Sequence, residues 1–163
     1  QGKKPDLIIV DYADLLRGQN LRGRELRHEL GNIYEDLRGL AGEHGIPVWT
    51  ASQANRSAIN EDVIQADKIA ESYSKIMTAD FVISLSRKLE DKTAGTGRWH
   101  IIKNRFGPDG ITFPSKMNAS NGHIEIYEPN SVQGQETQQE INQGSEYIRK
   151  LLKDKFVQQQ QKD

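Results

Sequence analysis

Asp11 is the first residue of this 163-residue sequence whose position suggests chemistry, because it ends the stretch DLIIVD. Residues 7–10 form an unbroken apolar run, which is typical of a strand buried on both faces of a parallel sheet and covered by helices. A carboxylate at the end of such a strand has two interpretations. It caps the turn into the loop, or it belongs to a metal or phosphate site, because open α/β sheets bind ligands beyond the carboxyl ends of their strands.

A hydroxyl and an amide follow the next predicted strand, at residues 47–51. Ser52 and Gln53 open the stretch SQANR directly after it. In a right-handed parallel sheet the two strand ends share an edge, so we expect Asp11 and Gln53 to face a common space. Asp11 would hold Mg²⁺ through water, and Gln53 would donate to a phosphate oxygen. The alternative is that Gln53 is a loop amide that satisfies backbone groups.

Two cations form the third group, in the stretch KNRFGPDG. Lys103 and Arg105 are separated by one residue at the end of a predicted strand, so their side chains point to the same side. The Gly107–Pro108 turn that follows would restrict their movement. An arginine presented in this way suits bidentate contact with phosphate. The alternative is an ordinary solvated pair of charges.

The elements that must position these residues alternate along the chain. Strands are predicted at residues 7–11, 47–51 and 80–85, parallel and adjacent, with helices between them and antiparallel strands after Arg98. The first helix is indicated by apolar residues at helical spacing, namely Leu26, Leu30, Ile33, Tyr34, Leu37 and Leu40. A second helix is expected over residues 68–78. The prediction is an α/β fold, with a parallel sheet flanked by helices and antiparallel strands added at its C-terminal end.

The chain divides into a core at residues 1–129 and a Gln-rich tail at residues 130–163. Within the tail, residues 135–156 have an apolar stripe that predicts an amphipathic helix docked on a neighbouring subunit or partner. A disordered terminus is the alternative. Because the chain starts almost directly on a strand that needs cover, we expect it to be a fragment of a longer protein.

Composition limits the classes of partner. The formal net charge of -1 gives no general basic field, so a nucleic-acid surface must be a local patch. The absence of cysteine excludes disulfides and thiolate metal sites, and it suits a reducing cytoplasm. No apolar stretch approaches the length needed to cross a bilayer.

In their order and spacing, the motifs resemble the C-terminal part of the RecA-like motor domain of DnaB-family replicative DNA helicases, including those of phages. The resemblance runs over residues 7–127. It is carried by four stretches, which are LIIVDY (the Walker B element), IPVWTASQANR, AESYSKIMTADFVISL and KNRFGPDG.

The resemblance implies roles for the three groups of residues and adds ATP (or another NTP) and Mg²⁺ as cofactors. Asp11 would be the Walker B aspartate that supports the Mg²⁺-nucleotide, with Ser52 nearby in a supporting role. Gln53 would sense the γ-phosphate. Lys103 and Arg105 would reach into the nucleotide of the neighbouring subunit, with Arg105 as the arginine finger.

The resemblance also implies a DNA-tracking loop over residues 60–74 and a ring of identical subunits, a hexamer in the parent. The candidate DNA contacts in that loop and directly after it are Lys68, Glu71, Ser72 and Lys75. Ala70 stands where the family often has an arginine, so backbone N–H groups and the two lysines would carry the phosphate contacts. The implied partners are single-stranded DNA, the other subunits, and a primase or helicase loader.

The sequence departs from the family by an absence. It contains no G-x-x-x-x-G-K-[ST] loop to cradle phosphates, so we expect no ATP hydrolysis by this chain alone. Two other classes stay open at this point. One is a RecA-like ATPase of recombination or regulation, and the other is a degenerate RecA-like module that serves as an interaction scaffold.

Overall fold

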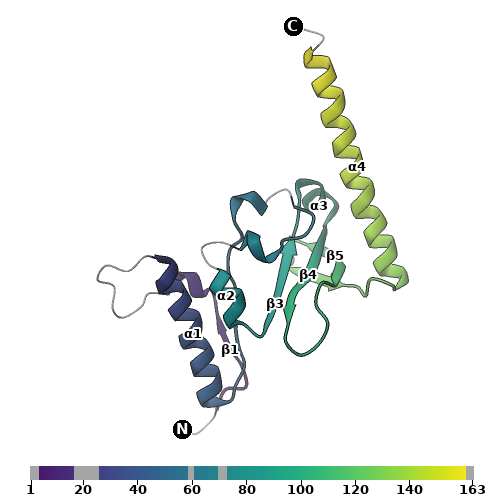
Figure 1. The fold of residues 1–163 in the computed structure, drawn as a ribbon. Coiled ribbons are helices and arrows are strands. Elements are labelled where there is room, and N and C mark those ends of the chain that lie inside the picture. Colours follow the sequence, from purple (N-terminus) through teal and green to yellow (C-terminus); the bar gives the residue numbers. More distant parts are fainter. Residues whose placement is uncertain (1–3, 17–25, 59–60, 70–72, 161–163) are drawn as a thin grey trace. The chain divides into compact units, whose positions relative to one another are not determined.

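The structure is a computed structural model that describes residues 4–16, 26–58, 61–69 and 73–160 (Figure 1). The chain forms two compact units, each built from separate stretches of sequence. The first unit comprises Gln1–Ala58, Gln65–Val82 and Ile102–Asp109. The second comprises Ile59–Ile64, Ile83–Ile101 and Gly110–Asp163.

The first unit is built on two parallel strands, as the sequence predicts. β1 (Ile8–Val10) pairs with β2 (Val48–Thr50), with Ile8 opposite Val48 and Val10 opposite Thr50. The helix between them, α1 (Leu26–His44), runs beside these strands in Figure 1. Gly45 ends it with a positive φ of 58°, a conformation that glycine adopts without steric cost.

One face of this small sheet is covered and the other is open. A short 3-10 turn, η1 (Ala13–Leu15), and α1 bury a core on the covered face. The core residues are Ala13, Ile33 and Tyr34, with Val10 and Leu37 packed against them. On the opposite face Ile9 is 71% exposed and its register partner Trp49 is 54% exposed. The prediction of burial on both faces is therefore wrong for the described residues.

The rest of the first unit consists of short elements. The 3-10 turns η2 (Arg56–Ala58) and η3 (Ala66–Lys68) precede a short helix, α2 (Tyr73–Thr78). The sequence predicts a helix over residues 68–78. In the described residues the helix is α2, which begins at Tyr73, and Lys68 belongs to the turn η3.

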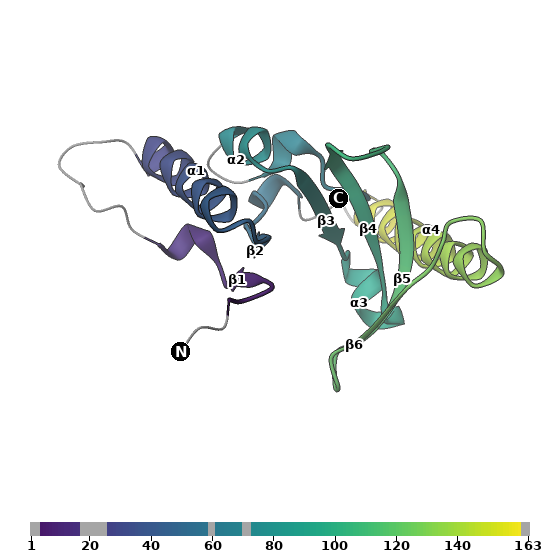
Figure 2. The same cartoon turned by 90° about the horizontal axis from the view of Figure 1, so that it is seen from below.

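The second unit contains a sheet in the order β3-β4-β5-β6, whose strands lie side by side in Figure 2. These strands are β3 (Phe81–Ser86), β4 (Thr96–Asn104), β5 (Thr112–Asn118) and β6 (His123–Ile126). β5 pairs antiparallel with both β4 and β6, which confirms the predicted antiparallel addition.

The prediction that the third strand lies next to the first two is wrong. In the described residues β1 and β2 form one sheet and β3 belongs to the other. Phe81 at the start of β3 contacts Trp49 of β2 through its ring, with centroids 6.4 Å apart. The two strands therefore meet through side chains and not through a backbone ladder.

The C-terminal helix, α4 (Val132–Gln160), includes the residues expected to be helical and packs partly on its own chain. Thr137 and Ile141 are each 1% exposed, and α4 lies beside β5 in Figure 2. Further along, Tyr147 and Leu152 are exposed. The first half of α4 therefore packs against its own unit. Among the helices that the structure describes, none is both apolar and long enough to span a membrane.

A buried carboxylate organises the turn between β3 and β4. Asp91 of α3 (Leu89–Ala94) is 1% exposed and accepts a hydrogen bond from the Lys88 backbone N–H at 2.8 Å. The same side chain accepts from the Thr96 hydroxyl at 3.1 Å and pairs with Arg98 at 2.6 Å. Because Arg98 is itself buried, it relies on this carboxylate to offset the cost of removing its charge from water.

We therefore expect Asp91→Ala to lower the free energy of unfolding by about 3 kcal/mol, since it leaves buried Arg98 with the more distant Asp62 carboxylate, at 3.7 Å, in place of its close partner. Urea unfolding followed by circular dichroism measures this loss. The control is Lys92→Ala, one position along, because the Lys92 side chain is exposed and should change stability by less than about 0.5 kcal/mol. Equal stability of the two variants would contradict the assigned role of Asp91.

Candidate functional site

The carboxyl ends of β1 and β2 meet at one edge of the first unit. Their parallel register places Val10 opposite Thr50, so Asp11 leaves the sheet beside the strand end that leads into Ser52 and Gln53. The Thr50 hydroxyl fixes this junction, because it accepts from the Ala13 N–H at 2.8 Å and donates to the Val10 carbonyl at 2.9 Å. The structure therefore brings the two predicted strand ends together.

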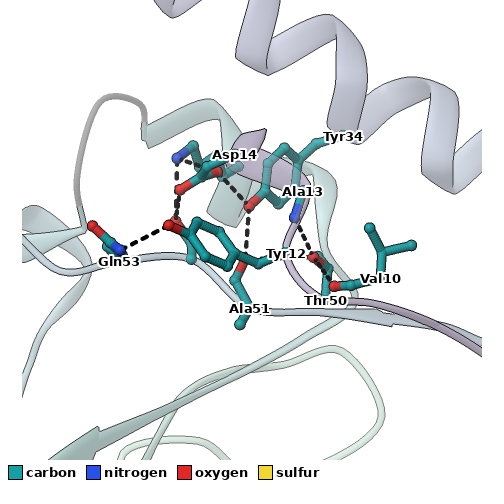
Figure 3. A network of polar contacts seen from close by, with 10 residues as sticks. Val10, Tyr12, Ala13, Asp14, Tyr34, Thr50, Ala51 and Gln53 are labelled. Atoms are coloured by element: carbon teal, nitrogen blue, oxygen red, sulfur yellow. Dashed lines mark hydrogen bonds and ion pairs between the residues drawn. The ribbon is translucent and has the colours of Figure 1, made fainter. Parts of the chain in front are cut away.

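Gln53 is held by the loop that follows Asp11. Its Nε2 donates to the Tyr12 hydroxyl at 2.9 Å, as Figure 3 shows. The amide is thus tied to the residue directly after the predicted metal-binding carboxylate. This contact occupies one N–H of the amide and leaves its oxygen and second N–H for other partners.

A second aspartate, which the sequence analysis missed, is the centre of the polar network in Figure 3. Asp14 accepts from the Tyr34 hydroxyl at 2.9 Å and from the Ser52 hydroxyl at 3.0 Å. Ser52 is therefore engaged by Asp14, and within the described residues no hydrogen bond of this network involves the exposed side chain of Asp11. The available signal was the repeat of aspartate three residues later, in DYAD.

Lys75 completes the network from α2 and does not serve as a surface contact for DNA. Its Nζ lies 2.8 Å from Asp14 Oδ1 and 3.1 Å from Ser52 Oγ, and the residue is only 3% exposed. The ammonium group also lies 5.5 Å from the centre of the Tyr34 ring, within the range of a cation–π contact. The prediction that Lys75 binds DNA is wrong, because a buried, paired ammonium group cannot reach a phosphate backbone.

The network controls the ionisation of its members. Burial raises the pKa of Asp14, but hydrogen bonds from Lys75, Tyr34 and Ser52 outweigh it and hold the pKa below its usual value. Burial is the largest influence on Tyr34 and raises its pKa; the hydrogen bond with Ser52 opposes this rise, and the Asp14 carboxylate adds to it. At neutral pH the centre is therefore a carboxylate that accepts from a neutral phenol, a hydroxyl and an ammonium group.

Lys103 and Arg105 have different surroundings although they lie on one strand end. Lys103 Nζ donates to the carbonyls of Ile76 and Met77 at 2.8 and 2.9 Å, so it caps the end of α2. Burial, followed by repulsion from Arg105, lowers the Lys103 pKa. Lys103 is therefore half-buried, and its ammonium group satisfies helix-end carbonyls that would otherwise lack partners.

Arg105 is half-exposed, with 48% of its side chain accessible. Its guanidinium group lies 2.8 Å from Asp80 Oδ1, and Arg38 approaches the same oxygen at 3.0 Å. Arg38 also donates to the Thr78 carbonyl. Asp80 thus holds two arginines at a partly open surface of the first unit.

The residues at this edge fit an Mg²⁺ ion that is bound mainly through phosphate. No cluster of three or more His, Cys, Asp or Glu side chains occurs in the part of the chain that the structure describes. Mg²⁺ commonly uses one or two carboxylates with water and substrate phosphates, and the exposed Asp11 can supply one such contact.

The predicted DNA segment is only partly described. Lys68 is half-buried and lies 3.8 Å from Asp67. Glu71 and Ser72 lie outside the described residues, and Lys75 belongs to the network above. Of the four predicted contacts, Lys68 is thus the one whose described position is compatible with a nearby phosphate.

The chain has an α/β fold in which two parallel strands end beside a carboxylate, a hydroxyl and an amide. Two solved structures share its fold. One, described as an ATPase domain, matches with a TM-score of 0.66 and 22% identity, over 75% of this chain and 44% of that one. The other, a DnaB-like replicative helicase described with its interactions with primase, matches with a TM-score of 0.61 and 22% identity, over 69% of this chain and 29% of that one.

The chain belongs to the DnaB-like helicase C-terminal domain family, whose model matches residues 1–119. It is 28% identical over 148 residues to a DnaB-like replicative helicase of Enterobacteria phage T4. It is 29% identical over 124 residues to a probable replicative DNA helicase of Trieres chinensis. The matches cover 88% and 70% of this chain, but only 30% and 27% of those relatives.

The lowered pKa of Asp14 predicts a pH-dependent contribution to stability. The stabilisation from Asp14 is complete above the ordinary aspartate pKa of about 4. It is lost as the pH falls through the pKa that Asp14 has in the folded protein, which is lower than the ordinary one. We expect Asp14→Ala to cost about 3–5 kcal/mol at pH 7, because it leaves Lys75 buried without its partner.

The measurement is the free energy of unfolding in urea across the acid range. The difference in free energy of unfolding between Asp14→Ala and the unmodified protein should become smaller as the pH falls. Asp67→Ala is the control, because the Asp67 side chain is exposed. A difference that stays constant down to strongly acidic pH would show that the Asp14 carboxylate is not the source of the stabilisation.

Proposed function

We propose that this chain is part of an ATP-driven replicative DNA helicase that assembles as a ring, a hexamer, and translocates on single-stranded DNA. One observation carries the proposal. In a member of the DnaB-like helicase family, the parallel ends of β1 and β2 bring Asp11 and Gln53 to one sheet edge. The family match also favours a replicative helicase over a RecA-like recombination ATPase or an inert scaffold.

In this proposal the edge binds an Mg²⁺-nucleotide. Asp11 holds the ion through water, and the ion, when bound, offsets negative charge on the phosphate oxygens. Gln53 directs its free N–H toward the terminal phosphate while Tyr12 fixes its position. Ser52 supports the edge through Asp14 and makes no direct contact with the nucleotide.

Arg105 is proposed to act on the nucleotide of the next subunit. Its half-exposed guanidinium group contacts the Asp80 carboxylate through one nitrogen, and a phosphate can replace that carboxylate because the planar fork of an arginine binds either group. Lys103 would have to release two helix-end carbonyls before it reached a phosphate. We therefore assign the charge supplied between subunits to Arg105 and a supporting position to Lys103.

The proposed DNA contacts lie in the segment at residues 60–74, with Lys68, Glu71 and Ser72 as candidates. The other proposed partners are the neighbouring subunits and a primase or helicase loader, acting in a bacterial cytoplasm or, for a phage-encoded protein, in the host cytoplasm. Because the chain lacks a phosphate-cradling loop, we propose that it hydrolyses ATP only as part of a longer protein.

The arginine assignment predicts the behaviour of Arg105→Ala in the full-length protein. The variant should bind nucleotide and assemble normally, because the Arg105 side chain contacts neither the strand ends nor the core. Its rate of ATP hydrolysis should fall by about 10³-fold or more, the range for arginine fingers in NTPases. Steady-state hydrolysis, nucleotide binding and sedimentation measure the three properties.

Arg38→Ala is the matched control, because it removes the other arginine from the same Asp80 oxygen. Mixing Arg105→Ala with Asp11→Asn should restore part of the activity, since each variant supplies the half-site that the other lacks. Normal hydrolysis by Arg105→Ala, or an equal loss in Arg38→Ala, would contradict the assignment.

A further inference from the structure

We infer that Lys75 is a positioning residue that couples the DNA-binding segment to the nucleotide edge. The inference rests on the proposed function and assigns a connection within it. Lys75 lies on α2, the helix whose first two residues end the proposed DNA segment, and its ammonium group bonds to Ser52, the neighbour of Gln53. One side chain therefore joins the helix at the end of the proposed DNA segment to the strand end that faces the nucleotide.

The contacts form a closed triangle, which makes the connection specific. Lys75 Nζ donates to Asp14 at 2.8 Å and to Ser52 at 3.1 Å, while Ser52 donates to the other Asp14 oxygen at 3.0 Å. Asp14 follows Asp11 by three residues and belongs to η1. A shift of α2 by about one ångström would take these bonds beyond hydrogen-bonding distance, so it must move Ser52 and Asp14 as well.

Burial strengthens the connection. Lys75 is 3% exposed and Asp14 has a side-chain exposure of 15%, so little water is available to replace a broken contact. A buried charge that loses its partner is costly, and therefore the two ends move together more readily than they separate. Lys75 also lies over the Tyr34 ring, which holds the ammonium group against α1.

The other end of α2 is also attached to a functional segment. Lys103 donates to the carbonyls of Ile76 and Met77, and Lys103 stands two residues before Arg105. A movement of α2 would thus be transmitted toward the nucleotide edge of its own subunit through Lys75. The same movement would reach the strand end that carries the arginine through Lys103.

The test is Lys75→Met in the full-length protein, with ATP hydrolysis measured against increasing concentrations of oligo-dT. We expect the factor by which DNA stimulates hydrolysis to fall by about 5-fold or more, the lower range of allosteric coupling. The affinity for fluorescent oligo-dT, measured separately by anisotropy, should stay within about twofold, because Lys75 is buried and does not contact DNA. Lys75→Arg should restore part of the stimulation, since it keeps a cation on Asp14.

Lys92→Met is the matched control, because Lys92 is exposed on α3 and should leave the stimulation factor unchanged. If Lys75→Met does not fold, the double variant Asp14→Asn with Lys75→Met removes both charges and should fold but remain uncoupled. Unchanged stimulation in Lys75→Met, a parallel loss of DNA affinity, or failure of both variants to fold would overturn the inference. Absence of DNA-stimulated hydrolysis in the unmodified protein would instead contradict the proposed function itself.

Discussion

The Asp14 carboxylate is the interaction on which the first unit depends. It receives the Tyr34 hydroxyl from α1, the Ser52 hydroxyl from the end of β2 and the Lys75 ammonium group from α2. Bonds to an ionised acceptor are stronger than neutral ones, and the lowered pKa keeps this acceptor ionised. Three elements that are far apart in sequence are therefore fixed around one charged side chain.

Two aspartates three residues apart have different surroundings in this arrangement. Asp14 has several donors and stands beside the core, whereas Asp11 is exposed at the strand end. A carboxylate that organises a fold must be desolvated and paired, and one that serves a hydrated Mg²⁺ ion must remain accessible to water. The separation of three residues, across the turn that Thr50 fixes, allows both conditions to hold in one short loop.

Local pattern is sufficient to predict some of these features and not others. The apolar run before Asp11 predicts β1, and the strand order predicts that the polar residues after β1 and β2 share an edge. The pairing of Asp14 with Lys75 spans 61 residues, so no local pattern reveals it. The sheet shows the same limit, because the apolar run identifies residues 80–85 as a strand, one residue from the observed β3, without specifying its neighbour. β3 therefore joins the antiparallel sheet, although the prediction places it beside β1 and β2.

The two cations at the end of β4 show how partners assign function to similar residues. Their spacing predicts a common side for both, yet Lys103 meets helix-end carbonyls and Arg105 meets the Asp80 carboxylate. A lysine has three donors on a flexible stem, so it can satisfy two carbonyls at once. An arginine has a planar fork that matches carboxylate and phosphate alike. Arg105 can therefore exchange Asp80 for a phosphate, whereas Lys103 cannot leave α2 without removing the donor from two helix-end carbonyls.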